Sequence, residues 1–170
     1  MLSRRETKDL VKAGKLIPVR SLADWEAAPR ALLQVTELTA EIASGRQYRD
    51  SKVAARWAKL EADMAHFVEG GYVNWGLMKW LDPQSQEVWE LRSVRPRPSI
   101  RVFGRFAEPD VFIGTNLAYR ADLKAKWSKE FWDEIFECEK IWKGLTSSSP
   151  FQGKEYTDYI TENAAKRVGV

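Results

Sequence analysis

The clearest pattern of apolar and polar positions along the chain is that of a helix. Its apolar residues recur every three to four positions: Ala54, Trp57, Leu60, Met64 and Phe67. Ser51 is a favoured N-cap residue type before them, and Gly70 and Gly71 follow as a stop, because glycine accepts the left-handed backbone conformation without a Cβ clash. We expect one amphipathic helix between these signals.

A second helix is predicted just before the first one. Its apolar residues also have helical spacing: Leu32, Val35, Leu38 and Ile42. Pro29 suits its first turn, and Gly45 ends it. Residues 21–24 read Ser-Leu-Ala-Asp, the sequence form of a capping box, and predict a short helix that stops near Pro29. The two longer helices are expected to form an antiparallel hairpin.

Between residues 87 and 116 the period of the pattern changes from helical to two. Three alternating runs have these apolar members: Trp89 and Leu91, then Ile100, Val102 and Phe106, then Val111 and Ile113. Residues 95–98 and 107–110, which contain prolines, separate the runs. The pattern is typical of an antiparallel meander with one face buried.

The ends of the chain have less marked patterns. Residues 15–20 suit a short edge strand, where a proline is tolerated. Ser128 is a favourable cap for a helix over residues 129–145, whose apolar side contains aromatic residues. Residues 146–153 have the serine, proline and glycine content of a linker, and residues 155–165 fit either a short helix or a loose arm.

These patterns predict an α+β fold, in which a small antiparallel β-meander packs on a helical hairpin and an extra C-terminal helix follows. A chain of 170 residues suits one domain with arms. We place a basic N-terminal arm at residues 1–20, the domain at 21–145, and a C-terminal linker and arm at 146–170.

The composition indicates in which cellular compartment the protein is expected. Cys138 is the only cysteine, so no disulfide forms within the chain and a reducing compartment is favoured. No apolar run approaches the roughly 20 residues that span a membrane, and the first residues lack the apolar region of a secretory signal. We therefore expect a cytoplasmic protein of a prokaryotic cell or a phage, without a membrane partner.

The charge is unevenly distributed although the net charge is only +3. One window is rich in cations: Arg92, Arg95, Arg97, Arg101, Arg105, Arg120, Lys124 and Lys126. Because side chains alternate along a strand, Arg92, Arg101, Phe103 and Arg105 are expected on the face opposite the apolar set. Arginines on one open face favour a phosphate chain or an acidic partner, and Phe103 and Phe112 would offer stacking surfaces. The alternative is an ordinary solvated sheet face, with arginines paired to nearby carboxylates.

Other reactive residues are better explained by structure. His66 is the only histidine and lies within the predicted first helix, and no cysteine cluster accompanies it, so we expect no metal and no cofactor. Glu137 and Glu139 flank Cys138, and negative neighbours disfavour a thiolate. The acidic residues of the last helix fit a solvated face.

The alternating runs resemble a known family. Residues 88–92 read VWELR, residues 100–106 read IRVFGRF and residues 110–113 read DVFI. In this combination they resemble the RelE/ParE toxin superfamily, and within it they are most similar to the HigB-like and phage-encoded branch. The likeness extends over residues 21–120, including the helical hairpin, and implies a small antiparallel sheet packed on two helices.

The resemblance also implies a function. Many members cleave messenger RNA on the ribosome, others poison DNA gyrase, and an antitoxin protein holds each in check. Carried over, Arg92 matches the arginine of the ELR motif and Arg101 that of the next strand, where it would contact phosphate and stabilise developing charge. Tyr119 and Arg120 lie near the place of the family's phenylalanine and paired lysines, but they do not match that motif. Ile100 replaces the usual tyrosine, and no histidine lies near the sheet.

We therefore hypothesise a toxin or toxin-derived protein that engages RNA or the ribosome, with endoribonuclease activity if it is active. The candidate catalytic residues are Arg101, Tyr119 and Arg120. The candidate nucleic-acid-binding residues are Arg92, Arg95, Arg97, Arg101, Phe103, Arg105 and Lys124. The alternative is a non-catalytic module on the same fold that binds an antitoxin, gyrase or another phage or host protein.

Overall fold

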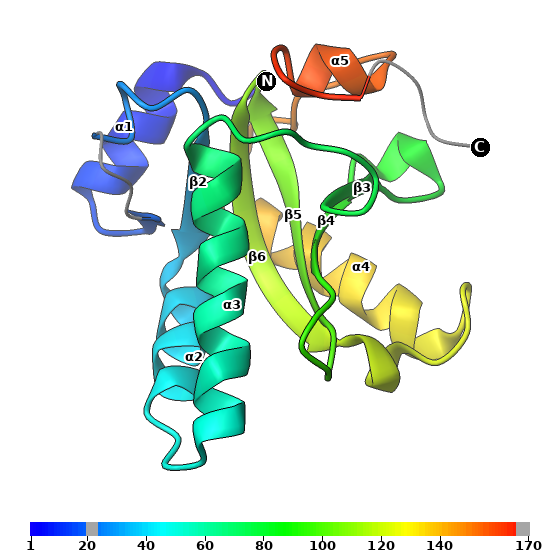
Figure 1. The fold of residues 1–170 in the computed structure, drawn as a ribbon. Helices are drawn as coiled ribbons and strands as arrows, with labels where there is room; N and C mark the ends of the chain where they lie inside the picture. The colour runs from blue at the N-terminus through cyan, green and yellow to red at the C-terminus, as the bar shows by residue number, and fades with distance from the viewer. Residues whose placement is uncertain (20–23, 166–170) are drawn as a thin grey trace.

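The centre of the fold is a six-stranded mixed sheet, seen in a computed structural model that describes residues 1–19 and 24–165. The strands are β1 (Leu16–Pro18), β2 (Ala31–Val35), β3 (Met78–Trp80), β4 (Trp89–Ser93), β5 (Ile100–Glu108) and β6 (Val111–Tyr119). Their spatial order is β1-β2-β6-β5-β4-β3, with β2 parallel to β6 and the other neighbours antiparallel. The described chain is therefore an α+β protein with an open sheet (Figure 1).

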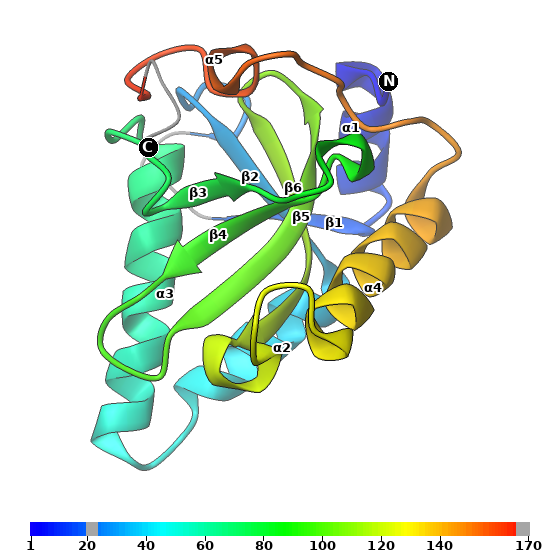
Figure 2. The same cartoon turned by 90° about the vertical axis from the view of Figure 1, so that its right-hand side faces the viewer.

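Helices cover both faces of the sheet. They are α1 (Arg4–Lys12), α2 (Thr36–Arg46), α3 (Ser51–Val68), α4 (Lys129–Leu145) and α5 (Tyr156–Tyr159), with the short 3₁₀ turns η1 (Gln84–Gln86) and η2 (Arg120–Leu123). The hairpin of α2 and α3 lies on one face and α4 lies on the other, while α5 sits at one end of the sheet (Figures 1 and 2). None of the described helices is long and apolar enough to cross a membrane.

The prediction of the α3 helix is confirmed, and so is its pairing with a preceding helix. Its N-cap is Asp50, whose Oδ1 accepts hydrogen bonds from the backbone N–H groups of Lys52 and Val53 at 2.8 and 3.3 Å. The two helices pack closely where Gly45 of α2 meets the indole of Trp57, because a Cβ at Gly45 would lie 2.2 Å from that ring. The small residue is what allows the hairpin to close.

The predicted helix from Pro29 to Gly45 is wrong in its first half. Residues Ala31–Val35 form the buried strand β2, which pairs with β6 in parallel, and helix α2 begins only at Thr36. A short apolar run satisfies helix and buried-strand patterns equally, and here pairing with a distant strand decides between them. The short helix predicted from Ser21 to Pro29 begins outside the described residues, and residues 25–27 form a turn.

The meander is confirmed and is longer than predicted. β4, β5 and β6 pair in sequence order, and β5 and β6 run for nine residues each. β3 and the pair β1–β2 extend it on its two sides, so the meander is the middle of a larger mixed sheet. The edge strand expected within residues 15–20 is confirmed as β1.

Two apolar clusters flank the sheet. The larger one joins the hairpin side of the sheet to Leu38, Ile42, Trp57, Leu60, Met64 and Phe67. The smaller one lies under α4 and contains Leu81, Val88, Phe103, Leu123, Ile135 and Cys138. Both faces of the central strands are therefore buried, which is why each of the first eight residues of β5 is buried.

The two terminal segments are not arms. At the N-terminus, Ser3 and Glu6 form a capping box on α1, and Leu2 is fully buried. At the C-terminus, Tyr156, Tyr159 and Ile160 are buried in the larger cluster. Burial of these side chains makes residues 156–160 part of the domain rather than a loose extension.

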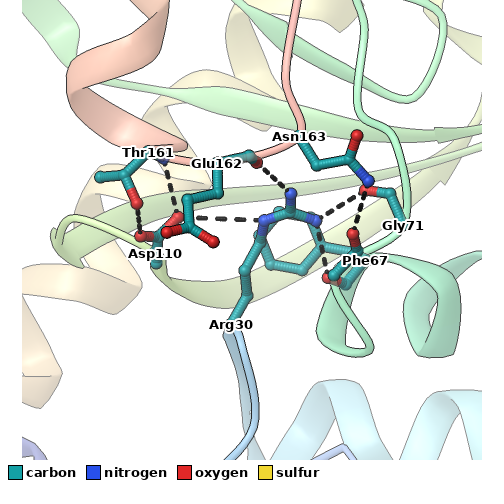
Figure 3. A network of polar contacts seen from close by, with 8 residues as sticks. Arg30, Phe67, Gly71, Asp110, Thr161, Glu162 and Asn163 are labelled. Atoms are coloured by element: carbon teal, nitrogen blue, oxygen red, sulfur yellow. Dashed lines mark hydrogen bonds and ion pairs between the residues drawn. The ribbon is translucent and has the colours of Figure 1, made fainter.

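Arg30 ties the C-terminal segment to the rest of the fold (Figure 3). Its Nη1 donates to the carbonyls of Phe67 and Gly71 at 3.0 and 2.9 Å, and its Nη2 donates to the carbonyl of Glu162 at 2.5 Å. Asp110 lies 3.9 Å from its Nε and accepts a hydrogen bond from the backbone N–H of Thr161 at 3.0 Å. One buried guanidinium thus joins β2, the end of α3 and the chain after α5.

Candidate nucleic-acid interface

The face of the sheet that carries the predicted arginines is covered, not open. Arg101, Phe103 and Arg105 point to the side of α4, as the alternation of β5 predicts. However, Arg101 and Arg105 are only 4% and 6% exposed, and Phe103 is fully buried. The expectation of a solvent-reachable arginine face is therefore wrong for these residues. Phe103 and Arg105 are covered by α4, which lies on this side of the sheet (Figure 2), and Arg101 is buried beside Glu90.

Arg105, Phe103 and Phe112 are not part of the candidate interface. Phe103 packs edge-on against Phe131 of α4 at a ring-centroid distance of 6.2 Å, and Phe112 belongs to the hairpin-side core. Arg105 lies deep under α4, near the thiol of Cys138. None of the three presents a surface to a ligand, so the predicted stacking role of the phenylalanines is also wrong.

Three other arginines gather around one buried carboxylate. Arg92 and Arg101 are directly opposite on β4 and β5, and both lie near Glu90. Glu90 Oε1 is 3.4 Å from Arg92 Nε, and its Oε2 is 3.7 Å from Arg101 Nε. Arg120, at the end of β6, adds a further positive charge close enough to perturb Arg101. We call Glu90, Arg92, Arg101 and Arg120 the arginine cluster.

The arginine cluster has more cations than its own carboxylate neutralises. Burial lowers the pKa of Arg101 to about 10, Glu90 opposes this shift, and the charges of Arg92 and Arg120 reinforce it. Burial raises the pKa of Glu90, although the arginines oppose that shift. The Nε and Nη1 of Arg101, the Nε of Arg92 and the Oε2 of Glu90 are buried without a hydrogen-bond partner. Such groups are costly when unpaired, but these atoms are shielded from solvent, so an external ligand meets only the exposed cations around them.

The exposed part of the interface is the loop between β4 and β5. Arg95 and Arg97 are exposed there. The loop is held from behind by Arg56 of α3, which is buried and donates to the carbonyls of Ser93 and Arg95 at 2.9 and 3.1 Å. Two arginines are thus presented to solvent on a braced loop at the same end of the sheet as the arginine cluster.

The start of η2 joins this loop to the turn before α4. The backbone N–H of Arg120 donates to the carbonyl of Ser99 at 2.8 Å, and its Nη1 donates to the carbonyl of Lys124 at 2.6 Å. Lys124 is exposed and pairs with Glu130 of α4. Arg92, Arg95, Arg97, Arg120 and Lys124 thus lie at one end of the molecule, which we call the basic end.

Of the three predicted catalytic residues, Arg101 and Arg120 lie near each other in the arginine cluster, but Tyr119 lies apart from them. Tyr119 is opposite Ile100, and its ring packs edge-on against Trp57 of α3 at 6.3 Å, on the hairpin side of the sheet. Arg101 points to the other side, and Arg120 is exposed at the strand end. Burial raises the pKa of Tyr119, which disfavours the ionised form that a general base requires.

Other reactive groups lie away from the basic end. His66 Nε2 is 3.0 Å from the carbonyl oxygen of Tyr72, at the opposite end of α3. Burial raises the pKa of the Cys138 thiol to about 11. Within residues 1–19 and 24–165, no three histidine, cysteine, aspartate or glutamate side chains are grouped so that they would hold a metal ion.

Sequence reasoning named Glu90 only within the alternative, as a carboxylate that could pair with the sheet arginines, and the structure does place it beside Arg92 and Arg101. It missed Arg56 altogether. Glu90 precedes Arg92 by two positions, so strand alternation alone places both side chains on one face. Arg56 gives no such signal, since its carbonyl acceptors are about forty residues away. No protein-family model, curated protein or solved structure matches the chain. The site is therefore defined by its geometry and charge.

Proposed function

We propose that the protein binds RNA through its basic end and is a toxin-derived relative of the RelE/ParE superfamily. The observation that carries the proposal is the gathering of exposed cations at the basic end: Arg95, Arg97, Arg120 and Lys124. Phosphate oxygens supply both the negative charge and the acceptors that exposed guanidinium and ammonium groups bind. The loop that carries Arg95 and Arg97 is braced by Arg56, so these two groups are held ready for neighbouring phosphates.

Two further observations support RNA over a single small anion. Arg95 and Arg97 stand on a loop that Arg56 braces, next to the arginine cluster, so several phosphates of one chain are reached together. Exposed aromatic rings, Tyr48 and Trp127, precede α3 and α4. Cations beside exposed aromatic side chains are typical of surfaces that bind single-stranded nucleic acid.

The chain order supports the family assignment within the proposal. The α2–α3 hairpin precedes the β4–β6 meander and packs on one face of it, which is the arrangement that the resemblance implies. The six other helices and strands of the described chain, α1, β1, β2, β3, α4 and α5, enlarge that unit. We place binding, not cleavage, at the basic end, because Tyr119 and Arg101 lie on opposite sides of the sheet.

The test is the salt dependence of RNA binding. We would measure fluorescence anisotropy of a labelled oligoribonucleotide with the wild type and with the Arg95→Gln, Arg97→Gln, Arg120→Gln triple variant. Each lost phosphate contact reduces the slope of log K against log salt by about 0.7 to 0.9, so the triple variant should lose about two units of slope. Between about 50 and 200 mM salt, the wild type should weaken steeply.

A charge-matched control separates a specific surface from net charge. Arg5, Lys12 and Lys15 are exposed at the α1 side of the molecule, away from the basic end. Changing all three to glutamine removes the same total charge, and we expect it to leave the slope nearly unchanged. Equal losses in the two triple variants, or no RNA binding by the wild type, would refute the proposal.

Expression in a bacterial host tests the toxin part of the proposal separately. The wild type should slow growth, and the triple variant at the basic end should not. RNA binding without any effect on growth would support the RNA-binding interface and refute the proposed relationship to a toxin.

A further inference from the structure

Three aromatic side chains form a row on the outer side of α4 and the turn before it. Trp127 and Phe136 are 47% and 53% exposed, and Trp132 lies partly buried between them. The ring centroids of Trp127 and Trp132 are 5.7 Å apart, and those of Trp132 and Phe136 are 5.5 Å apart. The interplanar angles are 37° and 26°. We call these three residues the aromatic row.

Packing of the core accounts for only part of the aromatic row: Trp132 packs against the smaller apolar cluster, whereas Trp127 and Phe136 belong to neither cluster. The inner side of α4 already supplies Ile135, Cys138 and Trp142, all of them buried. Trp127 has a φ of 69°, a backbone conformation that bulky side chains rarely adopt. A strained residue whose indole stays in solvent adds little to folding, so the strain points to a use at the surface.

The aromatic row begins where the basic end stops. Arg120 donates from its Nη1 to the carbonyl of Lys124, three residues before Trp127. The ammonium of Lys126 lies 4.9 Å from the centroid of the Trp127 ring. Arg120 and Trp127 are thus exposed on the same short stretch of chain, and we expect a nucleotide chain whose phosphate is held at Arg120 to reach Trp127.

The cations along the aromatic row favour a nucleotide chain over a protein partner. Lys126 and Lys129 are exposed beside it and pair only with exposed carboxylates, Asp82 and Asp133. A protein that docked on the rings would cover these lysines, and lysine is depleted in the cores of protein interfaces. A nucleic acid instead uses the same lysines as phosphate contacts, while its bases stack on the rings.

We propose that the aromatic row stacks unpaired bases, so that the ligand class of the basic end is single-stranded rather than duplex RNA. This inference rests on the proposed function and names its substrate class. In a duplex the bases remain stacked on one another, and the arginines meet only the phosphates. Only a single strand gains from both surfaces.

The experiment compares a labelled single strand with the duplex of the same length. The proteins are the wild type, a Trp127→Ala, Phe136→Ala double variant, and Tyr72→Ala as the matched control. Tyr72 is 54% exposed at the other end of α3, so its loss removes an exposed ring without touching the row. Sedimentation of each protein alone would report self-association, and urea denaturation would check that each is folded.

We expect the wild type to bind the single strand more tightly than the duplex. The double variant should lose at least about tenfold for the single strand, since each stacked base contributes about 1 to 3 kcal/mol. Its duplex binding should be unchanged, and Tyr72→Ala should match the wild type in both.

Three outcomes would overturn the inference. One is a double variant that binds the single strand as tightly as the wild type does. Another is equal, salt-dependent binding of both RNA forms by the wild type, which leaves the proposed function standing. A dimer of the wild type that the double variant abolishes would assign the row to protein contact. Absence of any RNA binding refutes the proposed function itself and is thereby distinguished from these results.

Discussion

Replacing Arg30 by methionine should destabilise the protein more than any change to an exposed charge. Methionine keeps the apolar stem of the side chain but leaves three carbonyl oxygens without their donor. Hydrogen bonds from a charged donor contribute about 1.5 to 3 kcal/mol each, which sets an upper range of about 4 to 9 kcal/mol. Two of the three contacts are only partly buried, so water replaces some of the loss. We expect about 3 to 5 kcal/mol.

Urea denaturation followed by circular dichroism measures this loss, with a thermal midpoint lowered by about 10 °C as a second readout. Because Arg30 holds the carbonyl of Glu162, the C-terminal segment should also open more often. Trypsin should then cleave after the exposed Lys154 faster in the variant than in the wild type.

Arg46→Met is the matched control, since Arg46 forms an exposed ion pair with Glu61. Exposed pairs contribute about 0 to 1 kcal/mol, so this variant should unfold close to the wild type. An Arg30→Met protein that lost less than about 1 kcal/mol, with unchanged cleavage after Lys154, would refute the assignment of Arg30 as the tie between the C-terminal segment and the core.

Three other outcomes follow from the structure. Because burial raises the pKa of Glu90, the folded state holds that proton more tightly than the unfolded state, and this contribution to stability is lost as pH rises through the folded pKa. Glu90→Gln should therefore gain in unfolding free energy relative to the wild type between about pH 5 and pH 8; a relative loss would contradict the dominance of burial over the attraction of Arg101. Gly45→Ala should destabilise by about 1 to 3 kcal/mol in a denaturant titration, because its Cβ meets the Trp57 indole at 2.2 Å; a neutral result would show that the hairpin shifts freely. Cys138 is buried and burial raises its pKa to about 11, so a thiol reagent should label it only in denaturant; rapid labelling of the native protein would disprove this burial.

Only part of the candidate site could be predicted from the sequence. Strand alternation placed Arg92 and Arg101 on one face, and the structure brings them directly opposite each other. The same reasoning put Phe103 and Arg105 on an open surface, but that face is covered by α4. Alternation says which side of a strand a residue takes, and it carries no information about which element covers that side.

The local patterns of the sequence determined α3, α4 and the three strands of the meander by themselves. In the helices the period and the cap, and in the strands the alternation and the flanking turn residues, lie within one stretch of chain, so neighbouring residues suffice to specify the element. Ser128, for example, accepts the hydrogen bond from the backbone N–H of Phe131 that starts α4.

Only the tertiary structure decided the features that depend on contacts between distant residues. The run Ala31–Val35 becomes a strand because β6, about 80 residues later, offers it a parallel partner. Arg105 of β5 is buried because α4 folds back over it, and residues 156–162 pack on the domain because Arg30 and the core hold them. The free energy of these features comes from burial and hydrogen bonds across long sequence separations, which no local period encodes.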